Sequence, residues 1–432
     1  MRQAFRASLM HCLKDPGESS DTSAVESIDD GLLVVEDGRV IEIGEASVLL
    51  PQLTDTTAVT DHSGKIIVPG FIDCHVHFPQ LDIIASYGEQ LLDWLERYAF
   101  PAEAKFADFA YAEEMAAVFL NELLKNGTTT ALVFGTVHAH SADAILQAAE
   151  QRGMRLIAGK VLMDSNCPRE LQDTPASGYA ESKALIERWH GKGRLGYAIT
   201  PRFALTSSEE QLIAAGRLAA EYPDVWVHTH LAENKTEVEE ISKLFPHSRS
   251  YLDVYDKAGL LRERSVFAHC LHMDDHDRDC LSKKGGAAAF CPTSNLFLGS
   301  GLFDLQAMRA ANVRVGLGSD VGGGTSLSLL RTASEAYKAL HLQHQALPAA
   351  RALYLATLGA AEALYLDDRI GNFEAGKEAD FVVLDPAGSS ISERRTRVAN
   401  SLDEVLFAIT MLGDDRNIAA TYVAGSLATA AA

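Results

Sequence analysis

The sequence is poor in cysteine, and its cysteines form no motif. Six occur in 432 residues, at positions 12, 74, 167, 270, 280 and 291, without a Cys-x-x-Cys pair. A disulfide framework or a structural zinc ribbon needs paired or regularly spaced cysteines. The spacing argues against both classes and favours reduced thiols, as in a cytoplasmic protein.

Basic residues and long apolar runs are also scarce. Lys and Arg number 38 against 59 Asp and Glu, which gives a formal net charge of −21. Such a charge repels phosphate backbones and anionic membrane surfaces, so we expect neither a nucleic-acid polymer nor a membrane as a partner. The N-terminal stretch is broken by Arg6 and lacks the apolar core of a signal peptide. A cytoplasmic location is therefore expected.

What is present is an ordinary globular composition, 47% hydrophobic and 22% charged, enough for one large core and an accessory domain. Residues 31–44 predict a β-hairpin that turns at Asp37-Gly38. From residue 65 onward, apolar strands alternate with amphipathic helices such as 112–123. Eight strands are predicted: one that begins at residue 65 and ends at two histidines, and seven at 128–134, 155–162, 195–203, 225–231, 265–269, 287–291 and 313–319.

Eight strands that alternate with helices predict a (β/α)₈ barrel, in which catalytic groups lie at the carboxyl ends of the strands. Polar residues occupy those ends in this chain. His75 and His77 end the first strand, Arg202 the fourth, His230 the fifth, His269 the sixth and Asp320 the eighth. A doubly wound sheet is the alternative, but it would spread these residues along an edge.

The two termini predict a second element. β signals return at 370–384 and 421–425, after a helical region at 326–364, and they can pair with the N-terminal hairpin. The predicted fold is therefore α/β: a distorted (β/α)₈ barrel over residues 67–368, with a small β-sandwich domain built from residues 1–66 and 369–432.

His75 and His77 are the first candidates for metal binding. Residues i and i+2 of a strand face the same side, so the two imidazoles form half of a divalent metal site. By itself such a pair is as often part of a surface or a core, so further ligands have to come from elsewhere.

Five motifs follow one another in a recognisable order: PGFIDCHVHF, HTHLAEN, AHC, CPTSN and GLGSD. They resemble the amidohydrolase superfamily, in particular its aminohydrolase branch, over nearly the whole chain. Further segments are more similar to the members of this branch that deaminate guanine than to those acting on cytosine, adenosine or triazines. These segments are SYGEQLLDWLERYAFPAE, TTTALVFGT, ITPRFALTSS and SNLFLGSGLF.

The resemblance implies one Zn²⁺ per chain. The ligands that it assigns are His75, His77, His230 and Asp320, and three imidazoles with one carboxylate suit a catalytic zinc. Binuclear relatives need a carbamylated lysine at the end of the fourth strand, where this chain has Thr-Pro-Arg-Phe. His228 is expected to be a core or supporting histidine. The purpose of Lys160, at the end of the third strand, stays open between a solvated and an ion-paired role.

The resemblance also implies the catalytic groups. Glu233, three residues after His230, matches the proton shuttle of the family, whereas by itself it would be a helix-cap or surface residue. His269 is expected to hydrogen-bond the attacking hydroxide, and Asp320 to take the proton of the water. His272 is expected to be a bystander and Asp73 a supporting residue.

Substrate binding is carried over to Gln80, Arg202, Phe203 and, beside its metal role, His230. Guanidinium donates well to a carbonyl oxygen such as O6 of guanine, and Phe203 offers a stacking face. Without the resemblance, Arg202 would be read as paired with a carboxylate, Phe203 as core and Gln80 as a loop cap.

The expected reaction is attack of water on C2 of guanine, giving xanthine and ammonia. The alternatives are an aminohydrolase of another heterocycle, such as an oxidised guanine or a pterin, a ring-opening cyclic amidase, or a scaffold without activity. Intact ligands and an intact glutamate favour the enzyme. The oligomeric state stays open, with a homodimer as one option.

Overall fold

The computed structural model describes residues 2–19, 21–88 and 90–430. The chain forms two compact units. One comprises Met1–Ile72, Asn121–Thr130 and Ser328–Ala432, and the other Asp73–Leu120 and Ala131–Leu327.

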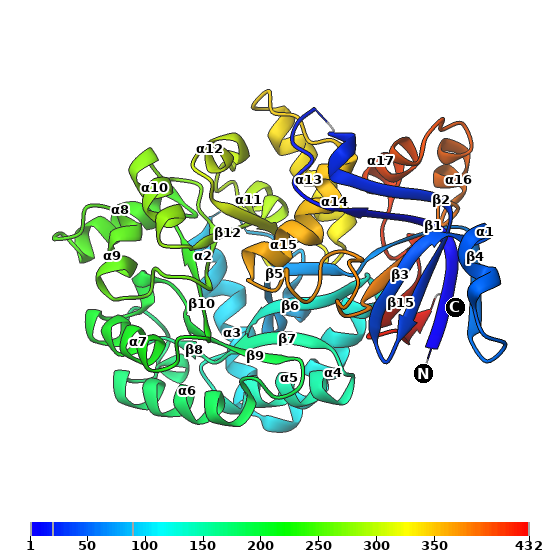
Figure 1. The fold of residues 1–432 in the computed structure, drawn as a ribbon. Helices are drawn as coiled ribbons and strands as arrows, with labels where there is room; N and C mark the ends of the chain where they lie inside the picture. Colours follow the sequence, from blue (N-terminus) through cyan, green and yellow to red (C-terminus); the bar gives the residue numbers. More distant parts are fainter. Residues whose placement is uncertain (1, 20, 89, 431–432) are drawn as a thin grey trace. The chain divides into compact units, whose positions relative to one another are not determined.

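The first unit contains a seven-stranded mixed sheet built from both ends of the chain, with strand order β16-β15-β14-β4-β1-β2-β3. Strand β1 lies parallel to β4 and antiparallel to β2, and register shifts near Ala7 interrupt both pairings. Figure 1 shows β1, β2 and β3 side by side. The strands are β1 (Arg2–Cys12), β2 (Val25–Glu36), β3 (Arg39–Glu45), β4 (Ala58–Pro69), β14 (Phe381–Leu384), β15 (Ile418–Val423) and β16 (Ser426–Ala430).

Two local predictions for this sheet have clear outcomes. The hairpin is confirmed, because β2 and β3 pair up to Glu36 and Arg39, and the turn residues Asp37 and Gly38 both have positive φ, 49° and 79°. The predicted start of the first barrel strand at residue 65 is wrong. Residues 65–69 belong to β4 and pair with β14. The apolar run continues unbroken from β4 into the first barrel strand, so its hydrophobic pattern does not show where one sheet ends and the other begins.

The helices of this unit are α1 (Ala46–Leu49), α13 (Leu329–His341), α14 (Ala349–Ala356), α15 (Leu358–Ala363), α16 (Ser390–Thr396) and α17 (Leu402–Leu412). The sheet contributes an apolar core in which Phe5, Phe381 and Tyr422 meet, with ring centroids 4.4–4.9 Å apart. Residues far apart in sequence therefore complete one core.

The second sheet is the predicted barrel. Its order is β13-β12-β11-β10-β9-β7-β6-β5, with β8 paired to β9, and the recorded pairings among β7 to β13 are parallel. The segment after β13 returns to β5, since the Asp320 amide donates to the His75 carbonyl at 2.9 Å and the His77 amide to the Val321 carbonyl at 2.9 Å. The strands are β5 (Phe71–His77), β6 (Thr128–Phe134), β7 (Arg155–Gly159), β8 (Val161–Leu162), β9 (Leu195–Pro201), β10 (Trp226–Leu231), β11 (Ser265–His269), β12 (Ala287–Phe290) and β13 (Arg314–Leu317).

The fold class is thus confirmed: a near-closed parallel barrel together with a mixed sheet from both termini. Helix α4 (Phe109–Lys125) precedes β6, and its prediction at 112–123 is confirmed. The further helices around these strands are α2 (Leu91–Trp94), α3 (Phe100–Ala104), α5 (Ala139–Gln151), α6 (Pro175–Trp189), α7 (Glu209–Glu221), α8 (Lys235–Leu244), α9 (Tyr251–Lys257), α10 (Asp275–Lys283), α11 (Pro292–Phe297) and α12 (Leu305–Ala310).

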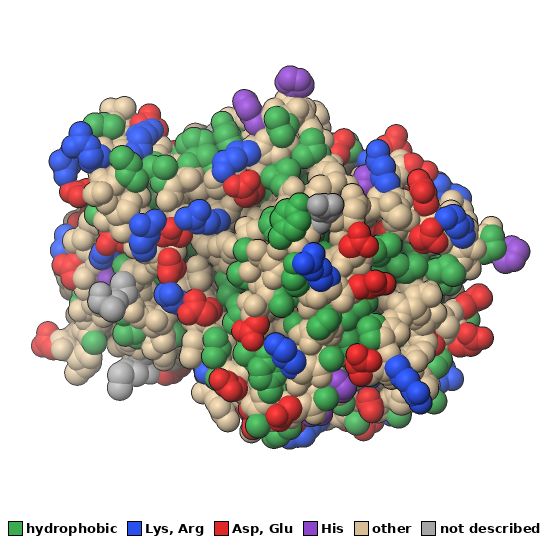
Figure 2. All heavy atoms as spheres, turned by 180° about the vertical axis from the view of Figure 1, so that it is seen from behind, with side chains coloured by type: hydrophobic (Ala, Val, Ile, Leu, Met, Phe, Trp, Pro, Cys, Tyr) green, Lys and Arg blue, Asp and Glu red, His purple; other side chains and the backbone are tan. Residues whose placement is uncertain are grey.

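The surface charges, the cysteines and the helix lengths can be compared with what the composition indicates. On the face shown in Figure 2, acidic and basic side chains are interspersed with apolar ones. All six cysteines are free thiols. Within the described part of the chain, no helix is both long and apolar enough to cross a membrane.

Candidate active site

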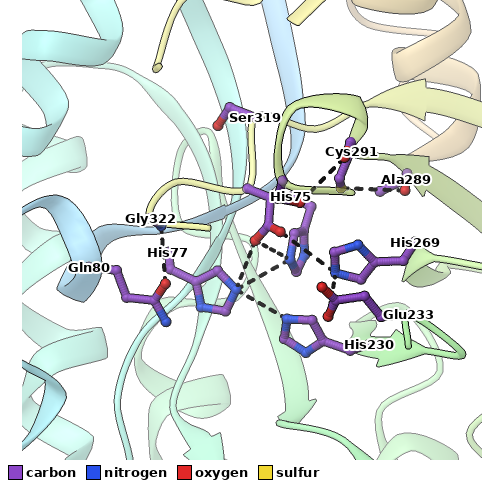
Figure 3. Close-up of polar contacts among 12 residues, drawn as sticks. His75, His77, Gln80, His230, Glu233, His269, Ala289, Cys291, Ser319 and Gly322 are labelled. Atoms are coloured by element: carbon purple, nitrogen blue, oxygen red, sulfur yellow. Dashed lines mark hydrogen bonds and ion pairs between the residues drawn. The ribbon is translucent and has the colours of Figure 1, made fainter. Parts of the chain in front are cut away.

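Three histidines and an aspartate converge at the carboxyl ends of the barrel strands. The rings of His75 and His77 come from the end of β5 and that of His230 from β10 (Figure 3). Asp320 follows β13. The Nε2 atom of His77 lies 3.3 Å from Nε2 of His75 and 3.2 Å from Nε2 of His230. Asp320 Oδ1 lies 3.1 Å from His75 Nε2 and 3.4 Å from His77 Nε2.

These separations match a tetrahedral metal site. Ligand atoms about 2.0–2.1 Å from a tetrahedral ion lie about 3.3 Å from one another. Burial lowers the pKa of His75, His77 and His230 well below the usual value, so the imidazoles are neutral and present lone pairs. Neutral imidazoles cannot satisfy one another through lone pairs, whereas a cation between them can. The residues therefore fit a divalent ion.

The second ring nitrogens support the same orientation. His230 Nδ1 donates to the carbonyl oxygen of Arg202 at 2.6 Å, which leaves Nε2 as the free acceptor. His75 Nδ1 lies 2.7 Å from Nε2 of His228, a fully buried residue one pleat deeper on β10. If His75 Nε2 binds an ion, His75 Nδ1 carries the proton and donates it to His228. The structure thus places His228 behind a predicted ligand.

His269 extends the cluster at the end of β11. Its Nε2 lies 3.4 Å from Glu233 Oε2 and 3.7 Å from Asp320 Oδ2, while Nδ1 bonds Asn295 Oδ1 at 2.9 Å. Burial lowers the pKa of His269, but the two carboxylates outweigh it and raise the pKa above its usual value. His269 and Asp320 have φ of 72° and 50°, a left-handed backbone that occurs where structure over-determines it, often at functional sites. His75, His230, His269 and Asp320 form a wider group with ligand atoms within 4.8 Å of one another.

Glu233 lies above His230, beyond the end of β10. Its Oε1 accepts from the Ser300 hydroxyl at 3.2 Å. Burial raises the pKa of Glu233 to about 7. Its backbone amide donates to Glu237 at 2.9 Å, inside the capping box that starts helix α8, so the helix start fixes the loop that carries it. A carboxyl group with this pKa can both accept and deliver a proton near neutral pH.

Asp73 lies on β5, two residues before His75. It accepts from the His75 amide at 3.1 Å and the Ser319 amide at 3.0 Å, and thereby ties β5 to the segment after β13. Burial raises the pKa of Asp73 to about 7. Its contacts are with backbone and a hydroxyl, as a supporting residue requires. His272 contacts the carbonyl oxygen of Ser300 at 3.0 Å.

A pocket opens over the cluster. Its lining combines polar side chains with apolar ones, as a site for a flat heterocycle needs. The lining residues are His77, Gln80, Leu91, Trp94, Leu95, Arg202, Phe203, His230, Glu233, Leu298, Asp320 and Gly323. All the residues predicted to bind substrate are among them.

Arg202 has a partner that the sequence analysis did not identify. Its Nη1 donates to both oxygens of Glu103, at 2.7 Å and 2.6 Å, and its guanidinium lies over the Phe100 ring at 5.2 Å. Gln80 Nε2 donates to the same carboxylate at 2.9 Å. Arg202 therefore combines the two roles that the sequence left as alternatives: it pairs with a carboxylate and it lines the pocket.

Three further contacts were missed, and all lie in segments that already carried the resemblance. Glu103 ends the SYGEQLLDWLERYAFPAE segment, Asn295 ends CPTSN, and Ser300 lies in SNLFLGSGLF. The motifs point to these segments, but nothing in their sequence pattern marks these three side chains as buried partners of site residues. Lys160, whose role was open, is ion-paired with Asp173 at 2.8 Å and Glu181 at 2.9 Å, away from the pocket lining.

Comparison with known proteins agrees with this geometry. The amidohydrolase family model matches residues 66–428. The guanine deaminase of Escherichia coli (strain K12) is 53% identical over 405 residues, which is 94% of this chain and 92% of that protein. The guanine deaminase of Homo sapiens is 33% identical over 442 residues, 98% of this chain and 95% of that protein.

Solved structures show the same likeness. The structure of E. coli guanine deaminase matches with a TM-score of 0.97 and 51% identity, over 100% of both chains. That of guanine deaminase from C. acetobutylicum, with guanine bound in its active site, matches with a TM-score of 0.90 and 28% identity, over 99% of this chain and 100% of that one.

Proposed function

The chain belongs to the amidohydrolase family, and within it we infer that the enzyme hydrolyses guanine to xanthine and ammonia. The observation that carries this function is 53% identity to a guanine deaminase over 94% of the chain. A relative with guanine bound in its active site shares the fold at a TM-score of 0.90. Guanine is therefore the substrate.

The family is metal-dependent, and we propose one zinc ion per chain, held by His75, His77, His230 and Asp320. Support comes from the four separations of 3.1–3.4 Å between their ligand atoms. When bound, such an ion acts as a Lewis acid that lowers the pKa of water and polarises the reacting carbon. The buried, neutral imidazoles would hold the ion, and the Arg202 carbonyl and His228 keep the rings of His230 and His75 in orientation.

Glu233 moves the proton in this proposal. Water adds to C2 of guanine, and Glu233 takes a proton from the nucleophile and gives it to ring nitrogen N3. The second proton of the water, taken first by Asp320, is relayed by Glu233 to the amino group on C2, which leaves as ammonia as the C2–N bond breaks and the carbonyl of xanthine forms. The raised pKa of Glu233, about 7, suits a group that has to be base and acid in one cycle.

His269 and Asp320 act on the attacking oxygen. Asp320 Oδ2 and Glu233 Oε2 flank His269 Nε2 at 3.7 Å and 3.4 Å, so the imidazole can hydrogen-bond an oxygen placed between them. Asn295 holds the other ring nitrogen, which orients the ring. Asp320 takes the second proton of the water, the one that Glu233 then relays to the leaving amino group.

Arg202, Gln80 and Phe203 recognise the base. Arg202 donates to O6, Gln80 hydrogen-bonds the adjoining edge, and the Phe203 ring packs against the heterocycle. Adenine has an amino donor in place of O6, so its bond to Arg202 cannot form. Because Glu103 already neutralises Arg202, the penalty is an unmade hydrogen bond, about 1–3 kcal/mol, and not an unpaired charge.

The free thiols and the absence of a membrane-spanning helix in the described residues are compatible with our proposal of a cytoplasmic enzyme. A homodimer stays a prediction, to be measured by sedimentation. The test of function is a panel of guanine, adenine, cytosine, 8-oxoguanine and a pterin, with ammonia release measured on metal-loaded protein. Guanine should be the preferred base. Faster release from any other member would overturn the assignment.

A further inference from the structure

A buried ion pair lies behind the end of the pocket that recognises the base. The Glu103 side chain is fully buried, the Arg202 side chain is 2% exposed, and their nitrogen and oxygen atoms approach to 2.6 Å. Arg202 lines the pocket, whereas Glu103 does not. The substrate therefore meets the cation and never meets its counter-ion.

The ion pair between Arg202 and Glu103 sets the net charge of the pocket wall that Arg202 forms. A buried guanidinium without a partner would attract any anion strongly, because low dielectric surroundings screen little. With Glu103 in place, the wall still donates hydrogen bonds but carries no net charge. It suits a neutral base with a carbonyl acceptor, as guanine is, better than an anionic one.

Gln80 depends on the same carboxylate. Its Nε2 donates to Glu103 and its Oε1 accepts from the Gly322 amide at 3.1 Å, as Figure 3 shows for the Gly322 contact. Turning the amide over would place its oxygen against the carboxylate and its amino group against an N–H. The contacts of Nε2 and of Oε1 therefore favour the same orientation of the Gln80 amide. The donor and acceptor that Gln80 offers to the base are fixed.

We propose that Glu103 is a positioning residue that makes the site select the neutral substrate over the anionic product. Xanthine has a second carbonyl in place of the amino group, which stabilises its anion, so xanthine ionises more readily than guanine. Neutralised Arg202 gives that anion no additional attraction, and the product leaves. The inference rests on the proposed function and concerns the same site.

The test compares two ligands in Glu103→Gln and in the unchanged protein. Inhibition constants are measured for xanthine, at a pH where it is anionic, and for hypoxanthine, a neutral 6-oxopurine. Loss of the counter-ion should strengthen the binding of xanthine relative to that of hypoxanthine by about tenfold or more, measured as the ratio of their inhibition constants, in line with one charge-assisted bond. At the same time KM for guanine should rise, because the Gln80 polarity is no longer fixed.

Three further variants isolate the cause. Glu103→Asp keeps the charge and should keep the original ratio of the two constants. The double variant Glu103→Gln with Arg202→Gln has an uncharged wall and should also keep that ratio, although guanine turnover falls. Asp173→Asn breaks a buried ion pair with Lys160 elsewhere in the same unit and controls for general loss of stability.

Each outcome decides. If Glu103→Gln weakens the binding of xanthine and of hypoxanthine equally, the carboxylate is merely structural and the inference fails. If Glu103→Gln does not fold, the double variant decides. Its wall is uncharged, so a ratio of inhibition constants shifted in favour of xanthine would also contradict charge matching. Failure of the proposed function looks different: the unchanged protein would release no ammonia from guanine, while the binding ratios could still be measured.

Discussion

Glu233→Gln is the most direct test of the chemistry. The substitution keeps the size of the side chain and its capacity to accept from Ser300, which lies 3.2 Å away, but the amide cannot relay a proton. The proposed cycle uses Glu233 for both proton deliveries, one to N3 and one to the leaving nitrogen, and each needs the carboxylate to take up a proton first. Asp320, the other carboxylate of the cluster, contacts His75 and His77 and in the proposal takes only the second proton of the water, so it does not replace Glu233.

The magnitude follows from general acid–base catalysis. A positioned proton-transfer group contributes about 10² to 10⁴ in rate, which corresponds to about 3–5 kcal/mol of barrier. We expect kcat to fall by at least the lower figure, while the KM for guanine changes little. Ser300→Ala, which removes only the hydroxyl contact to the carboxylate, serves as the milder matched variant and should reduce kcat less.

The assay is steady-state ammonia release, with metal content and guanine affinity measured on the same preparations. A Gln variant that binds metal and guanine normally and still turns over at nearly the original rate would refute the assignment of Glu233. If metal is lost as well, the residue supports the ion, and the rate loss says nothing about proton transfer. The measurement of metal therefore comes first.

Four further predictions follow from the same contacts. Protein carrying about one divalent ion should be fully active, and removal of the ion by a chelator should abolish turnover, so metal analysis finding two essential ions would contradict the mononuclear site. His228→Phe should weaken metal affinity about 10- to 100-fold by leaving His75 Nδ1 without a partner, and competition with a chromogenic chelator would reveal no change if the contact is incidental. The value of kcat/KM should rise with pH up to an apparent pKa at or below about 7, because Glu233 must be ionised to accept a proton. Burial raises the pKa of Glu233 to about 7, and a bound cation favours the carboxylate. A pH profile that lacks this rise, or a rise that persists in Glu233→Gln, would assign the base to another group. Arg202→Met combined with Glu103→Gln should lower kcat/KM for guanine about tenfold or more, measured against the Glu103→Gln parent, whereas unchanged kinetics would show that Arg202 does not read O6.

The barrel was predictable because its signal is local and repeated. Each strand is an apolar run of a few residues, and β6 and β11 occur exactly where the sequence places them, at Thr128–Phe134 and Ser265–His269. The failure at residues 65–69 has a physical origin. Strand β4 and strand β5 are both fully apolar where they adjoin, and only Gly70 separates them. Partner choice between two sheets is a tertiary property that periodicity does not encode.

The candidate site divides in the same way. Residues that end strands could be placed near one another, because a parallel barrel brings all carboxyl ends to one face. Glu103 could not, because it lies on a short helix outside the strands and meets Arg202 across 99 positions of sequence. The left-handed φ of His269 and Asp320 was likewise invisible, since neither is a glycine.

Two buried glutamates show why burial and residue type are insufficient to assign a role. Glu103 and Glu233 are both almost inaccessible, and both lie beside the same pocket. What differs is the partner. Glu103 is paired with the guanidinium of Arg202 at 2.6 Å and also accepts from Gln80. Glu233 faces a neutral hydroxyl and an imidazole whose own charge can change, so its proton can come and go. In the proposed function the first glutamate has to keep its charge while the second has to exchange its proton during every turnover. Exchanging their partners should therefore impair catalysis even though composition and burial would be unchanged.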